Sequence, residues 1–420
     1  MKKWMIIWCC VTVLLAGGCA AGLKEEQENS RVILTVLAGQ STSDAGIEDM
    51  INDWMGERFP EVELEWECVD WGEGFDTQIR GRFAAGDTPD IMIGKAQDVQ
   101  IYAGTGNLGV IPKKCSNLIK ENALNSVTVS EKVYGMPYNA WYQGVIYNKD
   151  IFNSLGLVPP STQEELDQII NILEENDIIP FAAHFQESWK IGNTTMQFMM
   201  NEIFRNTKDW GDQFRAGKVD FQGNETIENC MLNNKKILDH SWGDALVINQ
   251  YESDSRFTQG KAAMYLTGSW SMQFANQYGT KINFGIFPYP NTTGDADLIK
   301  ETNLTFMKSS HSSHGELIDD IFYALLSDEK LTQEILDFTQ SSSVVKKEIK
   351  SVYQSRIQSD IDQYEEQDRT IDVATGNAQL MWSFQNSVAN VQLSWLKNEI
   401  PLEEVLRYAD ENRMNSAYRK

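Results

Sequence analysis

The chain has 420 residues, of which 42% are hydrophobic, and its formal net charge at pH 7 is −24. A chain of this length is long enough for two or three domains with proper cores. Its negative charge repels phosphate backbones and gives no attraction to anionic lipid, which argues against nucleic-acid binding and against electrostatic attachment to a membrane.

The first nineteen residues have the pattern of an export signal. Lys2 and Lys3 precede an apolar run at 4–15, and small residues then lead to Cys19. This order is typical of a cleaved signal, and the run is too short to span a membrane. The small residues before Cys19 resemble the lipobox of bacterial lipoproteins, so we predict removal of 1–18 and lipidation of the Cys19 thiol. An ordinary signal with an incidental cysteine is the alternative.

Residues 19–30 are mostly polar and are predicted to form a tether between the lipid and the fold. Three cysteines follow, Cys68, Cys115 and Cys230, without a CxxC spacing. We expect no disulfide scaffold, with a single disulfide left open. Cys68 lies in a strand-like alternation and is expected to be a small buried apolar residue.

The first predicted elements alternate between strand and helix, in the order strand 31–37, helix through 47–54, strand 62–68, helix 75–85 and strand 90–93. The helix through 47–54 has apolar residues at the spacing of one helical face. This alternation is typical of an α/β fold with a parallel sheet covered by helices. Asp90 is expected to serve the turn before the last of these strands.

The same alternation begins again in the second part of the chain. Residues 144–147 are strand-like, and Ser161 and Thr162 each precede a glutamate by three residues. This pattern predicts a capped amphipathic helix, whose apolar face is Leu166, Ile169, Ile170 and Leu173. The last third is expected to be largely helical, ending in a helix after Pro401. Two such α/β units predict two lobes with a cleft between them.

Three groups of motifs follow one another along the chain. They are FAAGDTPDI at 83–91, VYGMPY at 133–138 with its continuation through 166, and FTQGKAAM at 257–264 followed by GSW at 268–270. In this order they resemble the extracellular solute-binding proteins of ABC importers, in the carbohydrate-binding family 1 that includes maltose-binding protein. The resemblance extends from about residue 31 to about residue 409.

The resemblance implies a two-lobed, periplasmic-binding-protein-like α/β fold of type II, in which the chain crosses between the lobes three times. The crossings are expected near 139–143, 282–288 and 308–315. Lobe 1 would comprise 31–140 and 285–312, and lobe 2 would comprise 141–284 and 313–420.

The resemblance also implies a function. The protein would bind a sugar, an oligosaccharide, between its lobes and deliver it to the permease of an ABC transporter. It would be a lipid-anchored monomer outside the cell, with no catalytic activity, no cofactor and no metal.

A sugar ring has C–H faces and a rim of hydroxyls, so its site requires flat aromatics beside amides or carboxylates. The chain has 12 Trp, many of them in predicted loops beside such residues. With the positions that the resemblance implies, the predicted ligand-binding residues are Gln40, Ser41, Trp71, Gln97, Asp98, Asn139, Trp141, Glu187, Trp189, Trp270 and Trp382. Trp54, Trp66 and Trp395 lie in periodic segments and are expected in the core. Trp141 replaces an acidic position of maltose-binding protein, which makes maltose doubtful as the ligand.

Two other motifs are interpreted as structural. GTGNLG at 104–109 fits the dinucleotide pattern, but Pro112 follows too closely for a helix to open, so we expect no nucleotide site. His311 and His314 lie in a serine-rich loop that is expected to be a linker rather than a metal site.

Three alternative functions stay open. An exported glycosidase would need two carboxylates about 5–10 Å apart, and candidates are Glu73, Asp98 and Glu187. A binding protein for peptides or another polar solute is the second alternative. The third is a signalling lipoprotein that presents sugar to a sensor.

Overall fold

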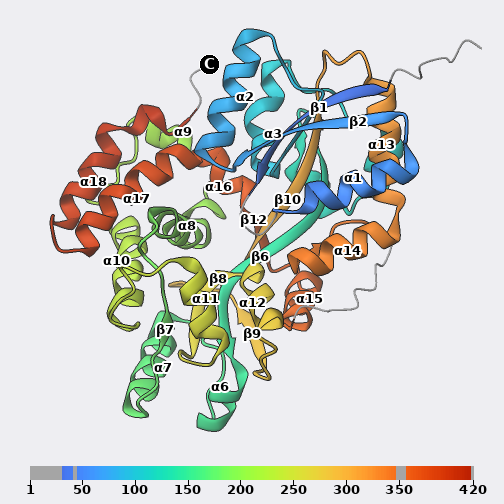
Figure 1. Cartoon of the computed structure of the whole chain (residues 1–420). Coiled ribbons are helices and arrows are strands. Elements are labelled where there is room, and N and C mark those ends of the chain that lie inside the picture. Colours follow the sequence, from blue (N-terminus) through green and yellow to red (C-terminus); the bar gives the residue numbers. More distant parts are fainter. Residues whose placement is uncertain (1–30, 41–44, 347–355, 418–420) are drawn as a thin grey trace, which may run out of the picture.

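The computed structural model describes residues 31–40, 45–346 and 356–417 (Figure 1). The predicted signal 1–18, the tether 19–30 with Cys19, and Ser41 lie outside these residues. Within the described part of the chain, no helix combines the length and the apolar character needed to cross a membrane.

The N-terminal alternation of strand and helix is confirmed. Strands β1 (Val32–Gln40), β2 (Val62–Asp70) and β3 (Ile91–Gly94) are separated by helices α1 (Ile47–Arg58) and α2 (Glu73–Ala85). Strand β1 pairs in parallel with β2 on one side and with β3 on the other. Parallel strands place their carboxyl ends at one edge of the sheet, so the loops after β1, β2 and β3 meet there.

Two long strands join this sheet to the rest of the molecule. Strand β10 (Leu298–Lys308) lies antiparallel between β3 and β6 (Met136–Asn148), and all thirteen residues of β6 are buried. The far half of β6 pairs with β8 (Met264–Gly268) and β9 (Phe284–Phe287). Strand β6 therefore belongs to two groups of strands, one around β1 and one around β8 (Figure 1).

The remaining elements cover the sheet or connect its strands. In chain order they are α3 (Ala96–Tyr102), α4 (Lys113–Ser116), α5 (Glu121–Ser126), β4 (Thr128–Val129), β5 (Lys132–Val133), α6 (Lys149–Leu155), α7 (Gln163–Glu175), β7 (Phe181–Ala182), α8 (Ser188–Met199), a π-helical turn (Met200–Phe204), α9 (Trp210–Arg215), α10 (Glu225–Asp239), α11 (Gln250–Thr258), α12 (Met272–Gln277), α13 (Gly315–Ser327), α14 (Glu329–Thr339), β11 (Ser342–Ser343), α15 (Gln358–Glu366), β12 (Thr370–Asp372), α16 (Ala374–Gln379), α17 (Trp382–Leu396) and α18 (Leu402–Glu411).

Helix α7 is capped as predicted. The Thr162 hydroxyl accepts the backbone N–H of Glu165 at 3.2 Å, and the Glu165 carboxylate accepts the backbone N–H groups of Ser161 and Thr162. These bonds satisfy donors that the first turn of a helix leaves without partners. The four predicted apolar residues of α7 are its buried face.

Helices α13 and α14 pack beside the first group of strands. The Trp54 indole on α1 donates to Asp328 at 2.9 Å, and the hydroxyls of Tyr138 and Thr332 are 2.8 Å apart. The predicted lobe boundaries stay a prediction, but these contacts favour placing residues 315–339 with lobe 1, whereas we expected them in lobe 2.

The expectations for the cysteines and core tryptophans have mixed outcomes. Cys68 is exposed, so the expectation of burial was wrong: β2 is the edge strand and has a neighbouring strand on one side only. All three cysteines of the described residues are free thiols.

Trp54 is buried as expected, and Trp66 and Trp395 are partly buried against the core.

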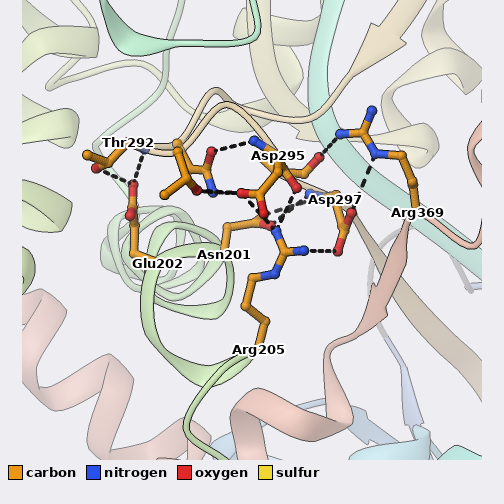
Figure 2. A network of polar contacts seen from close by, with 10 residues as sticks. Asn201, Glu202, Arg205, Thr292, Asp295, Asp297 and Arg369 are labelled. Carbon is orange, nitrogen blue, oxygen red and sulfur yellow. Dashed lines mark hydrogen bonds and ion pairs between the residues drawn. The ribbon is translucent and has the colours of Figure 1, made fainter.

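A polar network fixes the loop between β9 and β10 to the end of α8 (Figure 2). The Asn201 side chain donates to the Asp297 carbonyl at 3.0 Å and accepts the Asp297 N–H at 2.8 Å. Glu202 accepts the N–H and the hydroxyl of Thr292, and Arg205 lies 3.3 Å from the Asp297 carboxylate. The π-helical turn that carries Asn201 and Glu202 thereby holds the chain as it enters β10.

Candidate functional site

The candidate site begins at the edge of the sheet where β2 and β3 end. Trp71, which follows β2, donates its indole N–H to Asp98 at 2.9 Å. Asp98 lies in the first turn of α3 and also accepts the backbone N–H of Lys95 at 2.7 Å. Burial raises the pKa of Asp98 to about 6, although these hydrogen bonds and the nearby Lys95 charge lower it.

A pocket at this edge brings together predicted residues that lie far apart in the sequence. The ring centroids of Trp71 and Trp382 are 5.6 Å apart. Gly72 has a φ of +103°, and a Cβ atom there would lie 2.8 Å from the Trp382 indole nitrogen, so a side chain at this position would displace Trp382. The pocket is lined by Trp71, Gly72, Asp76, Asp98, Ile101, Asn377, Met381, Trp382 and Ser383.

A second pair of predicted tryptophans packs where β6 passes between the two groups of strands. The rings of Trp141 and Trp270 have centroids 5.5 Å apart and an interplanar angle of 69°, an edge-to-face arrangement. The Trp141 side chain is 2% exposed and donates to the Thr339 carbonyl at 3.1 Å. A Cβ atom on Gly268 would lie 2.1 Å from the Trp270 ring, which explains why glycine precedes this tryptophan in the GSW motif.

Lys95 connects the two tryptophan pairs. Its ammonium nitrogen lies 3.9 Å from the centroid of the Trp71 ring and 5.7 Å from that of Trp141. It also forms an ion pair with Glu301, which lies opposite Trp141 in the register of β10 and β6. Both charged side chains are buried. Cation–π attraction and the ion pair together hold the ammonium group between the aromatic rings.

A chain of side-chain hydrogen bonds continues from Glu301 into α8. The Gln143 side chain on β6 donates to Glu301 at 2.6 Å. The side chains of Asn193 and Gln197 donate to Gln143 at 3.0 and 2.9 Å. This relay extends from the end of β3, through both long strands, to the helix that packs on the second group of strands.

The other predicted residues are more dispersed. Asn139 is buried and donates to the Ser341 hydroxyl at 2.9 Å, close to Trp141. Gln97 is buried beside Asp98, and its side-chain oxygen has no hydrogen-bond partner. Gln40 ends β1 and donates to Glu48 at 2.6 Å. The Gln40 carbonyl also accepts the backbone N–H of Trp71 at 2.9 Å, which places the end of β1 beside the first tryptophan pair.

Glu187 and Trp189 form a separate group at the start of α8. The ring of His184 lies 5.5 Å from that of Trp189, and its Nδ1 atom is 3.1 Å from Glu187. Glu187 also accepts the backbone N–H of Gln250 at 2.9 Å. Burial lowers the pKa of His184 to about 4, so its ring is neutral at pH 7 and donates to the Glu187 carboxylate.

The family of the chain follows from a match over most of its length. Residues 38–332 match the model of the family described as bacterial extracellular solute-binding protein. The chain belongs to this family. A multiple sugar-binding protein of Streptococcus mutans is 23% identical to it over 353 residues, which cover 80% of each chain.

Solved structures show the same fold. A chitin oligosaccharide binding protein superposes with a TM-score of 0.75 at 17% identity, over 92% of this chain and 99% of that one. A sugar transporter protein of Bacillus licheniformis in complex with stachyose superposes with a TM-score of 0.74 at 17% identity, over 91% and 99%. The prediction of a two-lobed, type II periplasmic-binding-protein-like fold is therefore confirmed.

Asp90, which we expected to serve a turn, has structural contacts in this solute-binding protein. Asp90 accepts the N–H of Thr35 at 3.0 Å and the hydroxyl of Ser312 at 2.5 Å, which ties β1 and the loop after β10 to β3. The GTGNLG motif follows α3 rather than a strand, which is the wrong context for a dinucleotide site. Among the described residues, no three His, Cys, Asp or Glu side chains are grouped to hold a metal.

Sequence reasoning missed Lys95, Glu301 and Gln143, which connect the tryptophan pairs. Lys95 stands two residues before Gln97, in the loop that the resemblance already pointed to, and this position could have revealed it. Glu301 and Gln143 lie in buried strands and meet only through the pairing of β10 with β6. Their sequence neighbourhood carries no signal for that contact.

Proposed function

We propose that this chain is the extracellular substrate-binding component of an ABC transporter, and that it captures an oligosaccharide and delivers it to a membrane permease. One observation carries the sugar assignment: one tryptophan of each pair, Trp71 and Trp141, lies beside the ammonium group of Lys95, which is buried in an ion pair with Glu301. Indole rings match the C–H faces of a sugar, and the lysine and glutamate supply a donor and an acceptor for its hydroxyls.

The proposed ligand contacts come from both groups of strands. Trp71, Trp141, Trp270 and Trp382 offer stacking faces. Hydroxyl partners are the side chains of Gln97, Asp98 and Asn139, together with Lys95 and Glu301. The unpartnered side-chain oxygen of buried Gln97 supports a polar ligand, because a buried acceptor without a partner costs free energy. Glu187 and Trp189 would contact a more distant unit of the sugar.

The balance of charge favours a neutral oligosaccharide over an acidic one. Lys95 supplies the positive charge between the tryptophans, and Glu301 already pairs with it. Asp76 and Asp98 line the neighbouring pocket. A sugar carboxylate placed there would be buried beside like charges without a cation to itself, which is unfavourable.

The relay through Gln143 suggests how binding acts on the lobes. A sugar bound between the tryptophan pairs contacts residues from both groups of strands, so it stabilises whichever arrangement of the lobes lets it contact both. The closed arrangement would be what the permease recognises. We further propose that the signal is cleaved before Cys19 and that the protein is a lipid-anchored monomer.

A thermal-shift screen tests the sugar assignment. The panel comprises neutral oligosaccharides, galacturonate oligosaccharides and short peptides. A true ligand at a hundredfold excess over Kd stabilises the fold by about 2.7 kcal/mol. We expect the largest shift with a neutral oligosaccharide. A shift with peptides or galacturonates alone would contradict the proposal.

Chromatography of the recovered sugar then separates binding from hydrolysis. We expect the ligand to return unaltered after prolonged incubation. Steady, protein-dependent cleavage would instead indicate a glycosidase, for which Asp98 and Asp76 in the same pocket would be the first carboxylates to substitute.

A further inference from the structure

Three aromatic side chains gather on the surface of α11 and α12, and we call them the aromatic rim: Tyr251, Phe274 and Tyr278. The ring centroid of Phe274 is 5.3 Å from that of Tyr251 and 6.4 Å from that of Tyr278. Tyr251 is 56% exposed and Tyr278 is 41% exposed. Large aromatic side chains normally bury most of their surface, so an exposed group of them marks a binding surface.

The side chains of the rim contact one another. The Tyr278 hydroxyl donates to the Tyr251 hydroxyl at 2.8 Å, which fixes the two rings relative to each other. Phe274 packs against both tyrosine rings and is partly buried on α12. The rim thus presents aromatic faces together with two hydroxyl oxygens that can still bond to a ligand.

Helix α12 joins the rim to the tryptophan site. It begins two residues after Trp270, and its Gln273 side chain donates to the Phe338 carbonyl at 3.0 Å. The neighbouring residue Thr339 accepts the indole N–H of Trp141 through its carbonyl. The end of α14 therefore contacts the tryptophan site on one side and α12, with the rim, on the other.

Helix α11 joins the rim to the group around Glu187. It begins at Gln250, whose backbone N–H donates to Glu187 at 2.9 Å, and Tyr251 is the next residue. Helices α11 and α12 pack side by side (Figure 1). The two helices that carry the rim are therefore connected to both groups of predicted ligand-binding residues.

We propose that Tyr251, Phe274 and Tyr278 form an outer subsite for the far units of a longer neutral oligosaccharide whose inner units stack on Trp141 and Trp270. This inference rests on the proposed function. The occupant is the same sugar chain because α11 and α12 connect the rim to the site and because the rim repeats its aromatic and hydroxyl chemistry. Asn276 and Gln277 lie between Phe274 and Tyr278 in the chain and are exposed, and amides are partners for sugar hydroxyls. The Asn276 amide also donates to Gln340 at 2.8 Å.

The test compares affinity across sugar length. Calorimetry measures the binding of maltodextrins, chito-oligosaccharides and galacto-oligosaccharides of two to six units to the wild type, to Tyr251→Ala and to Tyr278→Ala. Tyr323→Ala is the matched control, because Tyr323 is 44% exposed on α13, away from the rim. In the series of sugars that binds, the rim variants should have about three- to tenfold lower affinity for the longest sugars and unchanged affinity for the shortest.

Each outcome has a distinct meaning. An equal loss at every length, or no loss at any length, overturns the outer subsite. Unchanged binding at all lengths with impaired uptake by cells also overturns it, because the rim would then contact the permease. If the wild type binds no sugar of any length, the proposed function itself fails. Melting temperatures close to wild type confirm that the variants are folded.

Discussion

The carboxylate of Asp98 accepts the indole N–H of Trp71 at 2.9 Å, and Asp328 accepts that of Trp54 at the same distance. The two bonds differ in their surroundings. Asp98 is buried, and burial raises its pKa to about 6. Partial burial also raises the pKa of Asp328, but hydrogen bonds from Trp54, Leu331 and Arg58 outweigh it and hold the pKa below its usual value.

The stability that each aspartate contributes should therefore change with pH in opposite directions. The pKa of Asp98 is higher in the folded state than in the unfolded state. Its contribution to the free energy of unfolding, on the order of 3 kcal/mol, is therefore fully present below about pH 4 and is lost as the pH rises to about 6. The stability of Asp98→Asn relative to wild type should increase over this window. The stability of Asp328→Asn relative to wild type should instead increase as the pH falls below about 4. Chemical denaturation at several pH values measures both.

The tryptophan pairs should separate binding from stability. We expect Trp270→Ala and Trp141→Ala to weaken binding of the sugar found in the screen by roughly 1–3 kcal/mol, because each removes a stacking face. Trp395→Ala should lower the melting temperature and leave the affinity near wild type, because Trp395 packs against the core. Calorimetry at a temperature where all three are folded makes the comparison. Equal affinity losses in all three would remove the stacking argument.

Breaking the buried ion pair should lower the free energy of unfolding more than breaking an exposed one. Glu301→Gln leaves the Lys95 ammonium buried without its partner, and we expect the free energy of unfolding to fall by about 3–5 kcal/mol. The control is Asp320→Asn, which breaks the exposed pair with Lys114 and should cost less than about 1 kcal/mol. Replacing both partners by Lys95→Met and Glu301→Leu should recover part of the loss. Losses of similar size in Glu301→Gln and Asp320→Asn would contradict this account.

The network around the π-helical turn should control the loop before β10. Asn201→Ala removes the acceptor of the Asp297 N–H and the donor to the Asp297 carbonyl, a cost of about 1–3 kcal/mol. Hydrogen exchange of the Asp297 amide should become faster, while amides in α7 keep their protection. An unchanged exchange rate at Asp297 would mean that the other contacts of the loop are enough to protect this amide without Asn201.

The lipid anchor has its own test. Cys19→Ala should abolish labelling by palmitate and leave precursor or released protein. Cys68→Ala is the control, since Cys68 is an exposed thiol that we do not expect to carry lipid. Labelling that survives Cys19→Ala would refute lipidation at this residue.

Local patterns predicted the local structure well. The capping sequence at Thr162 and the apolar spacing of Leu166 and Leu173 define α7 in the structure as they did in the sequence. These signals work because cap and face are set by residues within one or two turns. Cys68 shows the limit, because alternation along β2 does not reveal that β2 is an edge strand.

Contacts between distant residues were the part that could not be predicted. The tryptophans of the site were identified by composition and resemblance, but the group that joins them was not. Gln143 and Glu301 meet because β10 pairs with β6 across more than 150 residues of chain, and Lys95 reaches Glu301 because β10 also pairs with β3. No periodicity in a single sequence encodes such a pairing.

The position of β10 also determines when the protein can fold. The ribosome completes β3 more than 200 residues before it completes β10, yet β10 is the neighbour of β3 in the finished sheet. Until then β3 has one open side, and β6 lacks the strand that links it to β3. Pairings so distant along the chain form slowly. The nascent chain therefore cannot complete this sheet until β10 has been made, and a chain that has not finished folding is the form that can be threaded through a membrane.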